Sequence, residues 1–333
     1  MGFLSALFGK KNETAPQQES SESSASDNYE MFRTLYGDYK VAKGYINKAE
    51  AGQRFLDYCA TIDKHEIDRK IRAELRTGKD KNYSGLYGYL PASQSPYDAI
   101  LESVERSHRI EAHRADECRD VTHAVAAIPR TKIELDESTV LHRLALSDMP
   151  IVSYTGIGTA FNRDRLPAFV VLSVETNGLK VQGGRILKLS AIRYEDYEPI
   201  AAFETLVNPG TPIPPEATAV NGITDADVAG APTLSQVAAS FVSFLGSSAI
   251  IGYSLPFDLK FLFSRGIDIV STKRRFYDML PLVRKVYSSD LDSFKLDDVL
   301  KNCRIYFDEP HSGLTDCYLI EKVFEHALDD LLE

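Results

Sequence analysis

Two different hydrophobic patterns divide the chain. Within residues 29–129, apolar residues recur at helical spacing, as at Ile67, Ile71 and Leu75, which is the pattern of amphipathic helices. From Phe169 onward, short continuous apolar runs are separated by turn residues, which is typical of buried strands. The sequence therefore predicts a mainly α-helical N-terminal domain followed by an α/β domain.

The longest predicted helix has a recognisable start. In the segment Ser95–Asp98, a serine can cap the helix, a proline follows in its first turn, and an acid occupies the third helical position. We expect this helix to run to about Ala127. No catalytic pattern is found within residues 29–129, so this domain is interpreted as a packing or interaction module of unknown role.

Three apolar segments predict consecutive strands at 169–174, 186–194 and 200–207, and a further strand is predicted at 249–253. Strands that come first and helices that come later are typical of a mixed sheet covered by helices. Residues 130–166 show no clear period and are predicted to be a connector with short strand-like pieces.

The N-terminal segment is predicted to lack a packed structure. Residues 12–28 are rich in Ser, Glu and Gln and contain almost nothing to bury, so residues 1–28 are interpreted as a disordered tail and linker. The apolar residues near the start are too few for a signal peptide.

Composition limits the classes of function. The chain has 333 residues, of which 44% are hydrophobic, and its four cysteines form no CxxC pair, which argues against a disulfide scaffold or a zinc ribbon. No apolar run is long enough to cross a bilayer, and we expect a cytoplasmic protein with no membrane span. The net charge of −10 argues against a broad duplex-DNA surface but permits action on a strand end.

Three short motifs occur in a fixed order in the second half. They are Ser173-Val174-Glu175-Thr176, the segment Gly252–Asp258 that ends in Phe-Asp, and the segment His311–Asp316 that reads His-x(4)-Asp. Together with the connecting segment Asn208–Thr233, they resemble the DEDDh 3′–5′ exonuclease superfamily, the group of the proofreading epsilon subunit of DNA polymerase III. The resemblance covers residues 167–330.

This resemblance implies a ribonuclease H-like domain, with a five-stranded mixed sheet flanked by helices, that removes nucleotides from 3′ ends with two divalent metal ions. Hard ions such as Mg²⁺ or Mn²⁺ prefer carboxylate oxygens. By motif, Glu175 and Asp316 would hold the ion that activates water, Asp258 would support the site through water, and His311 would be the general base. Taken alone, Asp258 also fits a helix-start acid and Asp316 a surface acid.

Several positions depart from the family pattern. Ser173 stands where the family has the Asp that bridges both metals, and a neutral hydroxyl is a poor ligand for Mg²⁺, so the second metal site is doubtful and the rate is expected to fall. Lys188 stands where strand two of the family has Glu, and Asn221 replaces a His. An introduced change at Ser173 alone would not explain the other departures. Candidate cleft residues are Thr176, Tyr253, Ser254, Phe257 and Lys188.

Two functions from different classes follow. The first is a 3′–5′ exonuclease that acts on the 3′ end of a single-stranded nucleic acid, with DNA favoured over RNA, and is weakened by Ser173. The alternative is a catalytically inactive exonuclease fold that binds nucleic acid or a replication or repair partner. A polymerase or sliding clamp is a candidate partner, although Leu4–Phe8 lacks the leading Gln of clamp-binding peptides.

Overall fold

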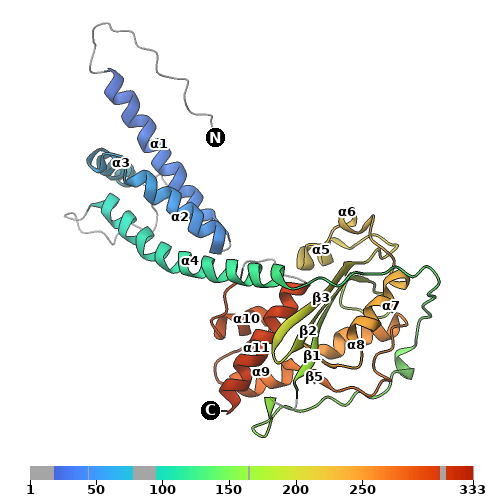
Figure 1. The fold of residues 1–333 in the computed structure, drawn as a ribbon. Helices are drawn as coiled ribbons and strands as arrows, with labels where there is room; N and C mark the ends of the chain where they lie inside the picture. Colours follow the sequence, from blue (N-terminus) through green and yellow to red (C-terminus); the bar gives the residue numbers. More distant parts are fainter. Residues whose placement is uncertain (1–18, 44, 78–94, 164–165, 308–312, 333) are drawn as a thin grey trace. The chain divides into compact units, whose positions relative to one another are not determined.

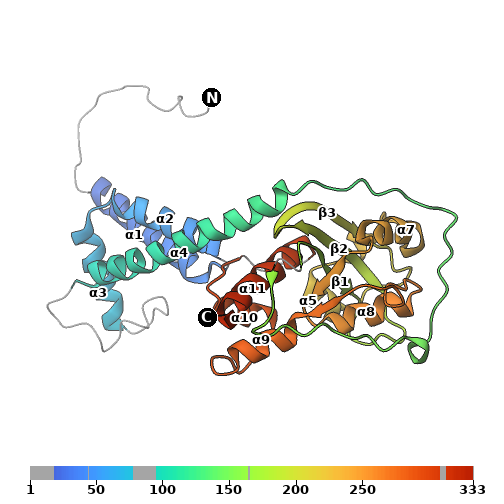
Figure 2. The same cartoon turned by 60° about the horizontal axis from the view of Figure 1, so that its bottom comes forward.

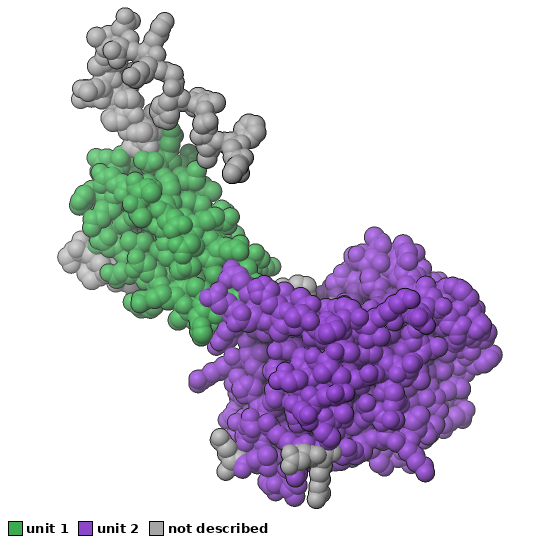
Figure 3. All heavy atoms as spheres, viewed as in Figure 1, with its two compact units in different colours: residues 1–115 green, residues 116–333 purple. Residues whose placement is uncertain are grey.

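The computed structural model describes residues 19–43, 45–77, 95–163, 166–307 and 313–332. The segment Leu4–Phe8, which lacks the leading Gln of clamp-binding peptides, and the predicted base His311 lie outside the described residues. The chain forms two compact units, residues 1–115 and 116–333 (Figure 3). None of the helices that the structure describes is both long and apolar enough to cross a membrane.

Unit 1 is helical and has its own apolar core. Its helices are α1 Glu19–Val41, α2 Tyr45–Cys59, α3 Lys64–Thr77 and the first part of α4 Pro96–Ala127 (Figure 1). Phe32, Phe55, Ile67, Ile71 and Tyr97 are buried together between these helices. The helical spacing of apolar residues therefore predicted this core correctly.

The predicted ends of α4 are confirmed, whereas α1 begins earlier than the sequence predicted. Helix α4 begins at Pro96 and ends at Ala127, and the backbone N–H of Asp98 donates to Ser95 Oγ at 3.0 Å, as expected for a serine cap. Helix α1 begins at Glu19, so part of the predicted tail of residues 1–28 is helical. The division between the units falls inside α4, and the predicted domain limits at 129 and 167 stay predictions.

Unit 2 contains a five-stranded mixed sheet with strand order β3-β2-β1-β4-β5. The strands are β1 Ala168–Thr176, β2 Ile186–Glu195, β3 Glu198–Leu206, β4 Ala249–Gly252 and β5 Phe276–Asp278. Strands β1, β2 and β3 pair antiparallel, whereas β4 pairs parallel with both β1 and β5. This arrangement confirms the predicted ribonuclease H-like exonuclease fold. Tyr277 and Asp278 end β5.

Helices cover both faces of the sheet. One face packs against α9 Met279–Tyr287, α10 Leu296–Asn302 and α11 Leu314–Leu332, and the other against α7 Leu234–Leu245 and α8 Leu255–Ser264 (Figure 1). Side chains of β1 alternate between these two layers. Phe169 and Val171 join the α11 layer, while Val170 and Leu172 join the α7 and α8 layer.

The predicted connector, residues 130–166, follows both edges of the sheet. Thr131 N–H donates to Ala202 O of edge strand β3 at 2.8 Å, and Thr155 N–H donates to Phe276 O of edge strand β5 at 2.7 Å. Figure 2 shows the segment passing outside α7 and α8 between these two points. The expected strand-like pieces amount to isolated bridges, such as the one between Tyr154 and Phe276. They pair edge groups that would otherwise be open to another chain.

Candidate active site

The end of β1 brings the first motif next to β2. Ser173 lies opposite Ser190, and Glu175 lies opposite Lys188, in the antiparallel register of these strands. Residues directly opposite each other on such strands share one face of the sheet. Because Phe169 and Val171 of the same strand pack in the α11 layer, Ser173 and Glu175 also belong to that face.

The second motif lies where β4 passes into α8. Helix α8 begins at Leu255, directly after Ser254, which has a left-handed backbone (φ 57°). The backbone N–H of Leu255 donates to Asp278 Oδ1 at 3.2 Å, and the N–H of Leu280 donates to the same oxygen at 3.3 Å. Asp278 thus caps α9 and fixes the start of α8, which positions Asp258 one turn further along.

Asp258 occupies an unfavourable position for a charge. Its side chain is buried, and burial raises the pKa of its carboxyl well above the usual range, with further raising by nearby Glu175, Asp316 and Asp278. A backbone N–H of Val174 donates to this carboxyl and offsets only part of the effect. The three carboxylates predicted from the motifs, one each from β1, α8 and α11, therefore lie within electrostatic reach of one another.

A second polar network lies beside these carboxylates. Lys188 Nζ is 4.0 Å from Glu204 Oε1, and that oxygen also accepts from Ser190 Oγ at 3.2 Å and from Leu314 N–H at 3.1 Å. A carboxylate is stabilised at the N-terminal end of a helix, which is the position of Leu314 in α11. Glu204 therefore ties β3 and Lys188 to the start of the helix that carries Asp316.

Glu204 and Asp278 were not predicted as site residues. Asp278 could have been found, because an Asp directly before a Met-Leu-Pro-Leu segment is typical of a helix cap. Glu204 carries no such local signal, since its role depends on contact with Leu314, which lies 110 positions further along the chain.

Two further cleft candidates, Tyr253 and Phe257, make contacts within the fold. Tyr253 donates its hydroxyl to Phe294 O at 2.7 Å, and burial raises its pKa. Phe257 packs against Phe261 with ring centroids 4.9 Å apart. These contacts make both aromatic residues part of the packing around the second motif.

The loop after β1 is held by Asn221, the residue in place of the expected His. Asn221 Nδ2 donates to Thr176 O at 3.1 Å, and Thr176 Oγ1 donates to Gly178 O at 2.9 Å. Asn221 ends helix α5 Pro215–Asn221, which lies before the short helix α6 Asp225–Val228. The Asn221–Thr176 contact fixes the loop that follows Glu175.

The donor set of the site suits a hard divalent ion. It consists of carboxylate oxygens from Glu175, Asp258 and Asp316, and an ion among them would relieve the burial of charge at Asp258. Among the described residues, however, no group of three or more acidic, Cys or His side chains is arranged to hold a metal ion. Lys188, opposite Glu175, adds positive charge to the same face. The residue types therefore suit a divalent ion, but the described residues are not arranged around one.

Gly313 is expected to be essential for the packing around Glu204. It has φ 69°, and an added Cβ would lie 2.2 Å from Glu204 Oε1 and 3.0 Å from Lys188 Cδ. We expect Gly313→Ala to lower the free energy of unfolding by about 2 kcal/mol or more, since a left-handed backbone with a Cβ already costs about 1–2 kcal/mol. Urea denaturation of the two proteins measures this loss.

Gly230→Ala is the matched control, because an added Cβ at Gly230 meets no atom within 4 Å. If both alanine variants unfolded at the same urea concentration, the close packing of Gly313 against Glu204 would be disproved.

The chain is similar to known exonucleases. Residues 170–324 match the Exonuclease family. The chain is 30% identical to the DNA polymerase III subunit epsilon of Aquifex aeolicus over 165 residues, which are 49% of this chain and 81% of that protein. It is 29% identical over 305 residues to the PolC-type DNA polymerase III of Clostridium perfringens, covering 88% of this chain and 20% of the polymerase.

Among solved structures, exonuclease X in complex with 5′ overhanging duplex DNA shares 21% sequence identity, with a TM-score of 0.38 over 49% of this chain and 90% of that chain. The chain spans only a fifth of the PolC-type polymerase but most of the epsilon subunit. The sheet order, the match to the Exonuclease family and the similarity to an epsilon subunit agree with the resemblance read from the motifs. The chain belongs to the DEDD exonuclease superfamily and is similar to the epsilon subunit of DNA polymerase III.

Proposed function

We propose that this protein is a metal-dependent 3′–5′ exonuclease whose second metal site is weakened. The observation that carries the proposal is the buried carboxyl of Asp258, whose pKa is raised by burial and by Glu175 and Asp316. Buried acids with a raised pKa are typical of catalytic sites, and a divalent cation would stabilise Asp258 in its charged form.

Each acid has a separate proposed role. Glu175 and Asp316 would hold the ion directly, while Asp258, deeper in the fold, would orient them or a bound water. The ion would lower the pKa of an attacking water and offset charge on the phosphate. His311, by its place in the third motif, would accept the proton of that water.

Ser173 and Lys188 explain why the activity is expected to be weak. A serine hydroxyl brings no negative charge to the position of the bridging Asp, and Lys188 lies opposite Glu175 on the same face of the sheet. Loss of one charged contact in the transition state costs several kcal/mol, or on the order of 10³-fold in rate. Lys188 could still offset charge on a bound phosphate.

The substrate follows from the family and from charge. The acidic chain suits one strand end better than a long duplex, so the proposed substrate is the 3′ end of a single strand, with DNA favoured over RNA. Mg²⁺ or Mn²⁺ is the proposed cofactor. The similarity to the epsilon subunit makes a polymerase a proposed partner.

A second candidate function is an inactive exonuclease fold that binds nucleic acid or a replication partner. Two observations favour it: Ser173 in the first motif, and Lys188 with its ammonium 4.0 Å from Glu204 Oε1 beside the carboxylates. In this case, the site would bind a phosphate without cleaving it.

Asp316→Asn separates these two functions. With a 5′-labelled single strand and Mg²⁺ or Mn²⁺, we expect the unmodified protein to shorten the strand slowly from its 3′ end. The Asn variant should be slower by on the order of 10³-fold, because it keeps the shape of Asp316 but removes a charged metal ligand. Gel electrophoresis of the shortened products gives both rates.

Asp329→Asn on the same helix is the matched control, since Asp329 is paired with Arg163 at 2.7 Å near the other end of α11. Its rate should equal that of the unmodified protein. Strand binding without shortening in the unmodified protein would instead support the inactive fold.

A further inference from the structure

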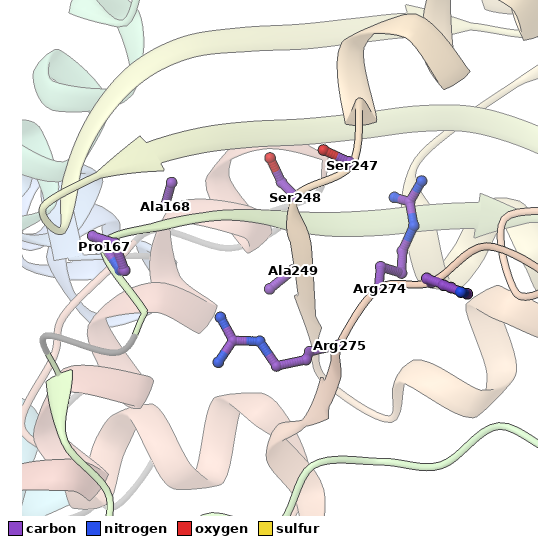
Figure 4. Close-up of a pocket in the computed structure, with 8 residues that line it drawn as sticks. Pro167, Ala168, Ser247, Ser248, Ala249, Arg274 and Arg275 are labelled. Atoms are coloured by element: carbon purple, nitrogen blue, oxygen red, sulfur yellow. The ribbon is translucent and has the colours of Figure 1, made fainter.

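A basic pocket lies at the end of the sheet opposite the carboxylates. Its described lining residues are Pro167, Ala168, Ser247, Ser248, Ala249, Lys273, Arg274 and Arg275, around a volume of about 630 Å³ (Figure 4). Ala168 begins β1 and Thr176 ends it, so the pocket and the carboxylate site are about 25 Å apart at ~3.3 Å per residue. The pocket is therefore separate from the proposed catalytic site.

The charge of this pocket contrasts with that of the chain. Three consecutive cations line it, and none of its described lining residues is acidic, although the chain as a whole carries −10. Lys273 and Arg275 are exposed. Such a local concentration of like charge attracts anions, and two serine hydroxyls beside it supply further hydrogen-bond donors.

Arg274 is held in place by the fold. Its Nη2 donates to Gly246 O at 2.7 Å, at the C-terminal end of α7, and its Nε donates to Thr272 Oγ1 at 2.8 Å. Its Nη1 is buried and has no hydrogen-bond partner among the described residues. A buried donor without a partner is costly, and a bound anion would satisfy it.

The capping of α7 explains the position of Arg274, but it does not explain why Lys273 and Arg275 line the pocket. Cations at helix C-terminal ends stabilise the last carbonyls, so Arg274 has a structural role. Figure 4 shows Arg275 extending to the other side of Ala249, towards Pro167. Lys273 forms no ion pair within the described part of the chain. These two side chains add positive charge that the capping does not require.

We propose that this pocket binds a phosphate group, either in the backbone of a nucleic-acid strand or in a small phosphate ester. Lys273 and Arg275 supply the attraction, while Arg274 Nη1 and the hydroxyls of Ser247 and Ser248 complete the binding. This function goes beyond hydrolysis at the carboxylates and does not require it. It gives an acidic exonuclease a second contact with a phosphate-bearing ligand.

The test is the double variant Lys273→Gln/Arg275→Gln, which leaves the Arg274 cap unchanged. Binding of a 5′-labelled single strand is measured by fluorescence anisotropy in EDTA over a range of salt concentrations. Each phosphate contact with a single strand contributes about 0.7 to the salt slope, so two lost contacts should lower the slope by about 1.4 and weaken binding on the order of 20-fold at 0.1 M salt. Lys285→Gln/Arg130→Gln, with two exposed cations outside the pocket, is the matched control.

Calorimetry with inorganic phosphate distinguishes the two sources of the ligand. A loss of strand binding only in the pocket variant identifies the backbone of a nucleic acid. A loss of phosphate binding with unchanged strand binding identifies a small phosphate ester. Equal binding of both probes by the pocket variant and its control would overturn the proposal. Because EDTA prevents hydrolysis, a failure of the exonuclease proposal leaves this result interpretable.

Discussion

Replacing Ser173 with Asp is expected to raise the rate of 3′-end hydrolysis by on the order of 10³-fold. Ser173 belongs to the face of β1 that carries Glu175, next to the buried Asp258. An Asp there would add a charged oxygen ligand where the first motif of the superfamily has one. The strand and its neighbours already have the geometry of the fold, and the substitution adds the negative charge that Ser173 lacks.

The rate is measured with a 5′-labelled single strand under single-turnover conditions, which report the chemical step. A second readout is independent of activity: titration with Mn²⁺, followed by calorimetry, should show an additional bound ion in the Asp variant. The matched control is Ser173→Asn, which has the size of Asp without its charge, and it should resemble the unmodified protein in both measurements.

Two results would contradict this interpretation. If the Asn and Asp variants gained activity equally, shape rather than charge would limit the site. If Ser173→Asp bound the extra ion but remained inactive, the defect would lie elsewhere, and Lys188 beside Glu204 would be the first position to change.

The sequence predicted the parts of this fold that depend on local periodicity. The strands near 169–174 and 186–194 and the long helix α4 have strong apolar patterns, and all three lie where they were expected. Strand β5 was missed because Phe276–Asp278 is too short to show a period, and its pairing with β4 is long-range.

The difference between local patterns and long-range contacts also applies to the site. The motifs predicted Glu175, Asp258 and Asp316 as site residues, which stays a prediction, and the structure places Glu175 and Asp316 within electrostatic reach of Asp258. Glu204 could not be found in this way, because its contacts with Lys188 and Leu314 join segments that are far apart in the sequence. The contacts of Glu204 depend on the packing of α11 against the sheet, and no local sequence pattern predicts that packing.

A second large effect is expected at Glu321, a buried acid of α11 outside the proposed site. Its side chain is fully buried, and burial raises its pKa to about 7, with repulsion from Glu325 opposing the attraction of Lys322. Lys322 Nζ lies 3.1 Å from Glu321 Oε2. Tyr194, Tyr197 and Tyr318 also face this carboxylate; burial raises their pKa values, and the charge of Glu321 raises them further.

The sign of the pH dependence follows from this shift. The carboxyl of Glu321 has an ordinary pKa of 4.5 and a folded pKa of about 7, so the folded state favours the protonated form. As pH rises above 4.5, the unfolded chain loses this proton while the folded chain keeps it, and the free energy of unfolding falls. The loss is complete above about pH 7 and amounts to roughly 3 kcal/mol at 1.36 kcal/mol per pKa unit.

Glu321→Gln removes this titration while it keeps the size of the side chain. We expect the variant to gain stability relative to the unmodified protein as pH rises, by roughly 2 to 3 kcal/mol between pH 5 and pH 8. Urea denaturation at both pH values measures the difference, and a constant offset from the new amide cancels in the comparison. The exposed Glu195 at the end of β2 gives the control, because Glu195→Gln should leave the pH dependence unchanged. If the difference in stability between Glu321→Gln and the unmodified protein stayed constant from pH 5 to pH 8, Glu321 would be charged throughout this range. The ion pair with Lys322, rather than burial, would then determine its state.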